Sequence, residues 1–222
     1  MSKLGIVVPY RDREEHLEAF IPHMESFLGD LDYEIVIAEQ PEGLSFNRGM
    51  MKNLGFLYIE DRCDQVCFHD IDMLPTRSDY SPTDIPILLA DEVQAFGYKR
   101  PYSRFFGGVI MFPSKDFRTI NGYCNDYWGW GVEDDDLKRR CQEHKIKTGV
   151  RSGRYDSLDH ETEGDTIGGK RPSKETINNR VLFYSKKFGD FSKVGLSDLN
   201  PKIISETKIG KKSVRVKFEV QR

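Results

Sequence analysis

The first seventy residues alternate short apolar runs with segments of helical periodicity, and this alternation limits the possible folds more than any other feature of the chain. The apolar runs cover residues 4–9, 33–38 and 65–68, and the first is continuous, as in a strand covered on both faces. Between the runs, apolar residues recur at the spacing of a helix. They are Leu17, Phe20, Ile21, Met24, Phe27 and Leu28, and then Phe46, Met50, Leu54 and Tyr58. The order strand, helix, strand, helix, strand predicts a parallel βαβαβ unit and therefore an α/β fold.

Local signals predict where these helices begin and whether they are interrupted. Asp12, followed by Glu15, resembles a capping box, and Ser45 is placed to cap the second helix. Pro22 lies inside the first helical segment. Because proline lacks a backbone N–H, we expect it to kink or restart that helix.

The second half of the chain is less regular. We expect strands over 93–96 and 109–112, helices over 133–144 and 175–188, and a polar loop over 159–171. Residues 213–220 alternate apolar and polar side chains, which predicts a half-buried strand. No segment has the composition of a linker, so we expect a single domain.

Composition excludes several classes of protein. The chain has 33 Lys and Arg against 36 Asp and Glu, and this net charge of −3 argues against nucleic-acid binding. No run approaches the ~20 apolar residues that span a bilayer, so we expect a soluble protein without a transmembrane segment. The four cysteines, none of them in a CxxC pair, are interpreted as free buried thiols of a reducing compartment: Cys63, Cys67, Cys124 and Cys141.

Polar clusters follow the three predicted parallel strands, where open α/β sheets bind their ligands. Asp70 and Asp72 form a D-x-D pair after the third strand. Two carboxylates this close favour a divalent cation with a preference for oxygen ligands, Mg²⁺ or Mn²⁺, which would bridge a diphosphate. Arg11, Arg13 and Arg48 are candidate diphosphate contacts because guanidinium groups fit phosphate oxygens, with solvated surface charge as the alternative.

Residues 128–136 are the most informative stretch, because both tryptophans of the chain alternate there with glycines and precede four acids. A tryptophan offers a flat apolar surface on which a sugar ring can lie. One of the carboxylates could act as a general base on a hydroxyl, or the acids could merely cap a helix. His160, in the polar loop, is either a surface histidine or a third metal ligand.

These segments resemble, in chain order, the motifs of the β-1,4-galactosyltransferase family, which are inverting glycosyltransferases of the GT-A fold. The string Trp-Gly-Trp-Gly-Val-Glu-Asp-Asp-Asp at 128–136 matches the family's W-G-W-G-x-E-D-D-D signature, and Asp70-Ile71-Asp72 matches its D-V-D metal motif. Further matching segments are 8–17, 46–49, 105–109, 120–123, 179–180 and 195–197.

The resemblance implies a GT-A-like fold and transfer of galactose from UDP-galactose, with inversion and with Mn²⁺, to a saccharide acceptor through a β-1,4 linkage. It divides the domain into a Rossmann-like nucleotide-binding half (1–75), an acceptor and catalytic half with a mixed sheet (76–200) and a C-terminal strand extension (201–222). Asp134 would be the general base, Glu133 would orient substrate, and Asp72 and His160 would bind the metal.

The remaining implied contacts are to the two sugar substrates. Those to the donor are Pro9, Tyr10, Arg11, Arg13, Phe46, Arg48, Asp70, Ile71, Asp72 and Trp130. Those to the acceptor are Tyr102, Phe105, Gly107, Gly108, Trp130, Glu133, Asp134 and Asp135.

Departures from the family pattern keep alternatives open. Phe105 stands where a tyrosine favours galactose, so UDP-N-acetylgalactosamine is an alternative donor, and Ser157 stands where some members place a methionine ligand. A non-catalytic sugar-binding protein would keep the tryptophans, whereas a nucleotidyltransferase would need a glycine-rich loop after the first strand. Because the sequence shows no membrane anchor, we expect a bacterial-type cytoplasmic enzyme of surface-polysaccharide synthesis. A lipid-linked acceptor would bring it to the inner membrane face.

Overall fold

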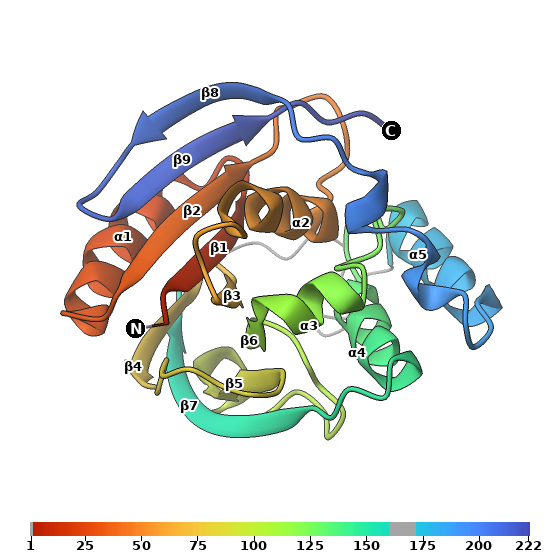
Figure 1. Cartoon of the computed structure of the whole chain (residues 1–222), viewed down its shortest axis with the longest axis horizontal. Helices are drawn as coiled ribbons and strands as arrows, with labels where there is room; N and C mark the ends of the chain where they lie inside the picture. The colour runs from red at the N-terminus through yellow and green to blue at the C-terminus, as the bar shows by residue number, and fades with distance from the viewer. Residues whose placement is uncertain (1, 160–171) are drawn as a thin grey trace.

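The computed structural model describes residues 2–159 and 172–222, which build one mixed sheet with helices packed on it (Figure 1). Its N-terminal unit comprises β1 (Leu4–Tyr10), α1 (Glu14–Leu28), β2 (Tyr33–Glu39), α2 (Arg48–Ile59) and β3 (Gln65–His69). Strand β1 pairs in parallel with both β2 and β3. The predicted parallel βαβαβ unit is therefore confirmed.

The other strands extend this unit on both sides. On one side lie β6 (Val109–Pro113), β5 (Ile87–Val93), β7 (Gly149–Ser157) and β4 (Met73–Arg77), and on the other β9 (Ser213–Phe218) and β8 (Ile203–Lys208). The order across the described sheet is β4-β7-β5-β6-β3-β1-β2-β9-β8, with antiparallel pairing of β6 to β3 and parallel pairing of β9 to β2. The sheet is thus mixed and continuous, as expected for a single domain.

The remaining helices follow strands β6 and β7 in the second half of the chain or lie between them. They are α3 (Ser114–Thr119), α4 (Glu133–Glu143) and α5 (Lys174–Ser185), with short 3₁₀ turns at Gln94–Phe96, Phe191–Lys193 and Leu196–Asp198. Helix α3 begins beside Asp64, at the amino end of β3. In the described part of the chain, every helix is too short or too polar to cross a bilayer.

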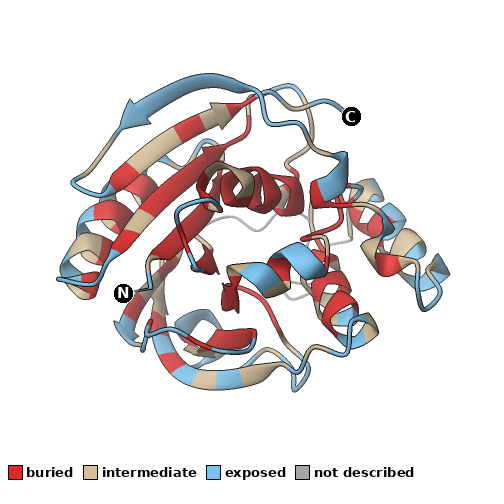
Figure 2. Cartoon of the chain, viewed as in Figure 1, coloured by how far each residue is buried: buried red, intermediate tan, exposed pale blue. Residues whose placement is uncertain are grey.

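The core lies on both faces of the central strands, which are buried almost throughout (Figure 2). Helix α2 packs closely on β1 because position 55 is glycine, and a Cβ there would collide with Val7. All four cysteines are buried and free, in agreement with the prediction.

Three predictions about where the first two helices begin or restart were wrong. Helix α1 does not restart at Pro22, because its buried apolar face stabilises it by more than one missing hydrogen bond costs. Its first residue follows Arg13, and Asp12 adopts φ 49° instead of forming a capping box. Asn47, not Ser45, caps α2, accepting a hydrogen bond from the Met50 N–H at 2.9 Å.

The predicted strand over 93–96 is also wrong. Strand β5 ends at Val93, and Gln94–Phe96 form a 3₁₀ turn closed by Gly97 in the left-handed region. The other predicted elements of the second half are present with shifted ends, apart from the predicted loop over 159–171, of which residues 160–171 lie outside the described part of the chain.

Candidate active site

The site lies where the loops after β1, β2 and β3 meet the N-termini of α2 and α4. Asp70 follows β3 directly, Arg48 opens α2, and Glu133 and Asp134 open α4. Parallel strands place their carboxyl ends at one edge of the sheet, so residues far apart in sequence come together there.

Acidic and basic side chains form a half-buried cluster at this edge. Arg48 Nη1 lies 3.3 Å from Glu133 Oε1 and 3.9 Å from Asp70 Oδ2. Although burial acts in the opposite direction, Asp70, Glu133, Asp134 and Asp72 hold the pKa of Arg48 well above its ordinary value. The D-x-D pair and the acids of α4, about 60 residues apart in sequence, therefore face the same guanidinium.

The carboxyl of Asp134 has a strongly perturbed pKa. Burial raises its pKa to about 7, with further contributions from Glu133 and Asp70, while Lys52 and Arg48 oppose the increase. A carboxylate with a pKa near neutrality is suited to accept a proton from a substrate hydroxyl.

Glycine at position 107 allows Asp134 to occupy its place. A Cβ on Gly107 would collide with Asp134 Oδ2 and lie 2.8 Å from Asp134 Cγ. The next residue, Gly108, adopts φ 72°, and its carbonyl accepts a hydrogen bond from the Asp70 N–H at 2.9 Å. Gly107 thus contacts the candidate base, Asp134, and Gly108 contacts the D-x-D segment at Asp70.

Val132 immediately precedes the two acids in the left-handed region, with φ 68°. A β-branched residue in this conformation is strained by about 1–3 kcal/mol. The strain lies at the N-cap of α4 and sets the direction in which Glu133 and Asp134 leave the loop.

The two tryptophans differ in exposure. Trp128 is buried, whereas Trp130 is only partly so. Asn179 of α5 donates hydrogen bonds to the carbonyls of Trp128 and Trp130, at 2.9 and 3.2 Å. The Gly129 N–H donates to the Phe46 carbonyl at 2.8 Å, so the tryptophan segment is fixed from two sides.

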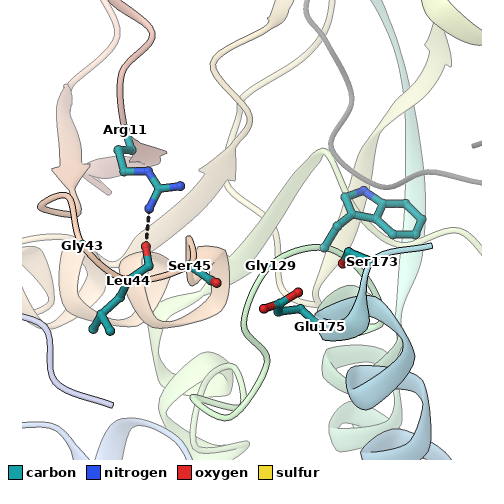
Figure 3. A pocket seen from close by; sticks show the side chains of 8 residues that line it. Arg11, Gly43, Leu44, Ser45, Gly129, Ser173 and Glu175 are labelled. Carbon is teal, nitrogen blue, oxygen red and sulfur yellow. Dashed lines mark hydrogen bonds between the residues drawn. The ribbon is translucent and has the colours of Figure 1, made fainter. Parts of the chain in front are cut away.

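Trp130 lines a pocket of about 520 Å³ at this edge (Figure 3). The other lining residues are Arg11, Gly43, Leu44, Ser45, Gly129, Ser173 and Glu175. Arg11 donates to the Leu44 carbonyl at 2.6 Å, and its guanidinium carbon lies 5.3 Å from the centre of the Phe46 ring. The pocket therefore combines a cation and aromatic surface, which suits an anionic nucleotide.

Not every predicted donor contact lines this pocket. Pro9 and Tyr10 are buried within β1, and Ile71 is buried after β3. The Tyr10 hydroxyl donates to Glu14 at 2.9 Å, and burial together with this contact raises its pKa to about 12. Arg13 is half-buried at the start of α1. The donor-binding roles of these residues stay predictions.

The predicted acceptor contacts fall into two groups. Gly107 and Gly108 lie against Asp134 and the D-x-D segment, as described above. The exposed Tyr102 packs edge-on against Phe105 at 5.6 Å between ring centres, and its hydroxyl donates to Asp135 at 3.4 Å. Gly107 therefore contacts Asp134 and Tyr102 contacts Asp135, two neighbouring acids in the first turn of α4.

Sequence reasoning missed two residues of the cluster, Lys52 and Tyr123. Lys52 Nζ lies 3.4 Å from Asp134 Oδ1, and Tyr123 OH lies 3.4 Å from the same atom. A signal existed, since Lys52 follows Arg48 by four residues and therefore shares its helix face.

The donor chemistry of the cluster fits a divalent cation. In the described part of the chain, Asp70 Oδ1 is buried without a hydrogen-bond partner. Asp70, Asp72, Glu133 and Asp134 outnumber Arg48 and Lys52, and carboxylate oxygens suit Mn²⁺ or Mg²⁺. Residues 2–159 and 172–222 contain no complete group of three His, Cys, Asp or Glu ligands, and His160 lies outside them.

Comparison with known structures assigns the architecture. The catalytic domain of Drosophila β-1,4-galactosyltransferase 7 in complex with xylobiose matches with a TM-score of 0.81 and 27% identity, over 100% of this chain and 95% of that one. A mutant of the same protein, in complex with manganese, UDP-Gal and xylobiose, matches with a TM-score of 0.79 and 25% identity over the same shares of both chains. The fold is therefore the GT-A fold of the glycosyltransferases.

Sequence comparison assigns the family. Residues 1–81 match the N-terminal region of glycosyl transferase group 7, and residues 89–162 match the N-terminal domain of galactosyltransferase. β-1,4-Galactosyltransferase 4 of Rattus norvegicus is 35% identical over 181 residues, 77% of this chain and 53% of that protein. The chain belongs to the β-1,4-galactosyltransferase family, as its motifs predicted.

The chain is also similar to a protein that is named for another donor sugar. The β-N-acetyl-D-glucosaminide β-1,4-N-acetylglucosaminyl-transferase of Lymnaea stagnalis is 37% identical over 173 residues, 73% of this chain and 35% of that protein. The chain thus spans about half, or less, of the length of these two curated relatives.

Proposed function

We propose that this protein transfers galactose from UDP-galactose to a hydroxyl of a sugar acceptor, with inversion at the anomeric carbon. The observation that carries the proposal is the partly buried Asp134 carboxyl at the start of α4, with a pKa of about 7, next to the D-x-D segment. The Drosophila relative, which binds manganese, UDP-Gal and xylobiose, supports the same choice of donor and metal.

Each part of the site has a role in this reaction. Asp134 takes the proton of the acceptor hydroxyl as its oxygen attacks the face of galactose opposite UDP. Glu133, held by Arg48, orients the sugars. Trp130 provides the stacking surface, and Arg11 with Phe46 binds the nucleotide end of the donor.

The proposed cofactor is Mn²⁺, with Mg²⁺ as the alternative. Asp72 and His160 would hold the ion. When bound, it neutralises the diphosphate and stabilises the departing UDP. Asp70 lies beside the nucleotide sugar, where Arg48 and Lys52 offset its charge.

The identity of the donor sugar is the less constrained part of this proposal. Phe105 keeps the bulk of the family's tyrosine without its hydroxyl, and the Lymnaea relative is named for transfer of N-acetylglucosamine. UDP-N-acetylgalactosamine is therefore the second candidate. A screen of UDP-galactose, UDP-N-acetylgalactosamine and UDP-N-acetylglucosamine against N-acetylglucosamine, glucose and xylose acceptors, with Mn²⁺, decides between them.

A non-catalytic sugar-binding protein is the competing function, and the variant Asp134→Asn separates the two. Loss of a well-placed base lowers the rate by about 10²–10⁴, so D134N should lose turnover while retaining UDP affinity by calorimetry. The matched control is Asp126→Asn, which removes an exposed carboxylate near the tryptophan segment and should keep full activity. Full turnover in D134N, or acceptor binding without any UDP release from the wild type, would contradict the enzymatic proposal.

We further propose that the acceptor is carried by a lipid, and that the protein works at the cytoplasmic face of a membrane in surface-polysaccharide synthesis. Support comes from α5 and the residues after it. One stripe there is half to four-fifths exposed and apolar: Ile177, Val181, Tyr184 and Phe188. Lys174, Arg180 and Lys187 accompany it, a composition that suits an anionic bilayer surface.

This location has its own test. Sedimentation with vesicles of phosphatidylglycerol and phosphatidylcholine should retain the wild type and release Val181→Glu, while both stay unbound with phosphatidylcholine alone. Asn178→Glu adds the same charge at an exposed polar position of α5 and is the matched control. Equal retention of V181E and wild type would exclude the stripe as the membrane contact.

A further inference from the structure

Lys52 is a charged group in the site whose role above is limited to offsetting the charge of Asp70. It lies on α2, one turn after Arg48, and its side chain has no exposed surface. Its Nζ lies 3.4 Å from Asp134 Oδ1 and 3.9 Å from Asp70 Oδ1. Lysine is almost never fully buried unless it is paired, so a specific interaction must hold it there.

Tyr123 connects Lys52 to the same carboxyl. The ammonium donates to the Tyr123 hydroxyl at 3.3 Å and lies 4.8 Å from the centre of its ring. The hydroxyl in turn donates to Asp134 Oδ1 at 3.4 Å. Both donors therefore meet Oδ1, whereas Oδ2 lies on the other side, against Gly107.

We propose that Lys52 is a positioning residue for the transfer: with Tyr123 it fixes Oδ1 of Asp134 and keeps the carboxyl ionised, so that Oδ2 receives the proton of the acceptor. This inference rests on the proposed function, because it assumes that Asp134 is the base. The side chain of Lys52 has no exposed surface, so it acts through Asp134.

The charges around Asp134 explain why a buried cation is needed. The groups that face it from α2, the segment after β3, α4 and the two flanking loops are Lys52, Arg48, Asp70, Glu133, Tyr123 and Tyr102. Without Lys52, Arg48 would be the one cation left among these described groups to offset Asp70, Glu133 and Asp134. Among the groups that lower the pKa of Asp134, Lys52 has the largest effect.

Two variants test the role of the charge. Lys52→Met fills the volume without a charge, and Lys52→Gln keeps a hydrogen-bond donor without a charge. In ¹³C NMR titrations of the metal-free protein, either change should raise the pKa of Asp134 by about 1–2 pH units. Such a change lowers the ionised fraction at pH 7 by about 5- to 50-fold. The rate of transfer at pH 7 should fall accordingly, and it should recover as the pH is raised towards 9.

Controls separate charge from packing. Tyr123→Phe removes only a neutral donor and should shift the Asp134 titration less than K52M does. Lys115→Met removes an exposed lysine on α3 and should leave both the titration and the rate unchanged. If K52M does not fold, K52Q carries the test, and a slower rate without recovery at high pH indicates a merely structural role.

The outcomes also separate this inference from the proposed function. A pKa of Asp134 within about 0.3 pH unit of wild type in K52M and K52Q overturns the role of Lys52, whatever the enzyme transfers. A raised pKa in a protein with no transferase activity overturns the proposed function, and with it the catalytic meaning of the Lys52 contact.

Discussion

Replacing Asp134 with asparagine should stabilise the folded protein at neutral and alkaline pH, although it removes the candidate base. Burial, with Glu133 and Asp70, raises the pKa of this carboxyl to about 7 in the folded state. In the unfolded chain a typical value is about 3.9. The folded state therefore binds the proton more tightly, so the contribution of this group to stability is complete below about pH 4 and is lost as the pH rises through 7.

The size of the effect follows from the two pKa values. Between pH 5 and pH 8, ionisation of Asp134 should cost the folded state about 2–3 kcal/mol, because each unit of pKa difference corresponds to about 1.4 kcal/mol. The asparagine side chain of D134N does not ionise, so the variant lacks this loss and should gain the same amount over wild type across this interval. Other groups titrate in both proteins, and their contributions cancel in the difference.

Urea unfolding in the presence of a chelator measures the effect directly. The free energies of unfolding of wild type and D134N are compared at pH 5, 6, 7 and 8. The advantage of D134N should grow steadily with pH, and the control D126N should follow the wild type. Parallel pH dependence of wild type and D134N would refute the argument, because it would mean that this carboxyl is ionised as easily in the folded state as in the unfolded chain.

Three further outcomes follow from the contacts in the site. Gly107→Ala should lower the rate of transfer by about 100-fold, because its Cβ displaces Asp134. The control is Gly149→Ala, whose Cβ would lie 3.2 Å or more from the side chains of Ile85 and Ile87, and it should keep full activity. Equal rates in the two variants would exclude the steric argument. Asn179→Ala leaves the buried carbonyl of Trp128 and the partly buried carbonyl of Trp130 without their shared donor. It should cost about 2–4 kcal/mol of stability in urea unfolding and raise the acceptor KM, and an unchanged KM would mean that the Trp130 segment keeps its position without Asn179. Chelation should abolish transfer and Mn²⁺ should restore it, and activity that persists after exhaustive chelation would remove the metal from the proposal.

The parallel unit could be predicted from sequence because its strands are buried on both faces. Such strands are continuously apolar, and the intervening helices show one apolar face, so both periodicities are visible. The exposed strands gave no such signal. β8, with the sequence IISETK, is exposed throughout, and β7, with GVRSGRYDS, lacks a regular alternation. Their pairing is decided by neighbouring strands, which a local pattern does not contain.

The candidate site could be predicted in part for a similar reason. Residues at strand ends and in the tryptophan segment follow from rules about the sheet edge and from the family motifs. Lys52 does not, because a lysine in a helix is expected to face solvent. Only the fold brings Asp134 and Asp70 to the buried face of α2, and their charges are what make that place suitable for an ammonium group.

Asp134 and Asp136, two acids of α4, differ in their contacts and therefore in their roles. Asp136 is fully buried and fully paired, with Arg140 Nε at 2.6 Å, Lys186 Nζ at 2.6 Å and the Tyr127 hydroxyl at 2.7 Å. The hydrogen bonds of Asp134 with described residues are longer, 3.4 Å to Lys52 and to Tyr123, and it faces two other carboxylates. The contacts of Asp136 join α4 to the segment after α5, whereas Asp134 pairs with the buried Lys52 at a long distance, which is costly for a partly buried charge. The strained Val132 and the collision that restricts position 107 lie next to the same carboxyl, and this concentration of local penalties indicates a functional role for Asp134.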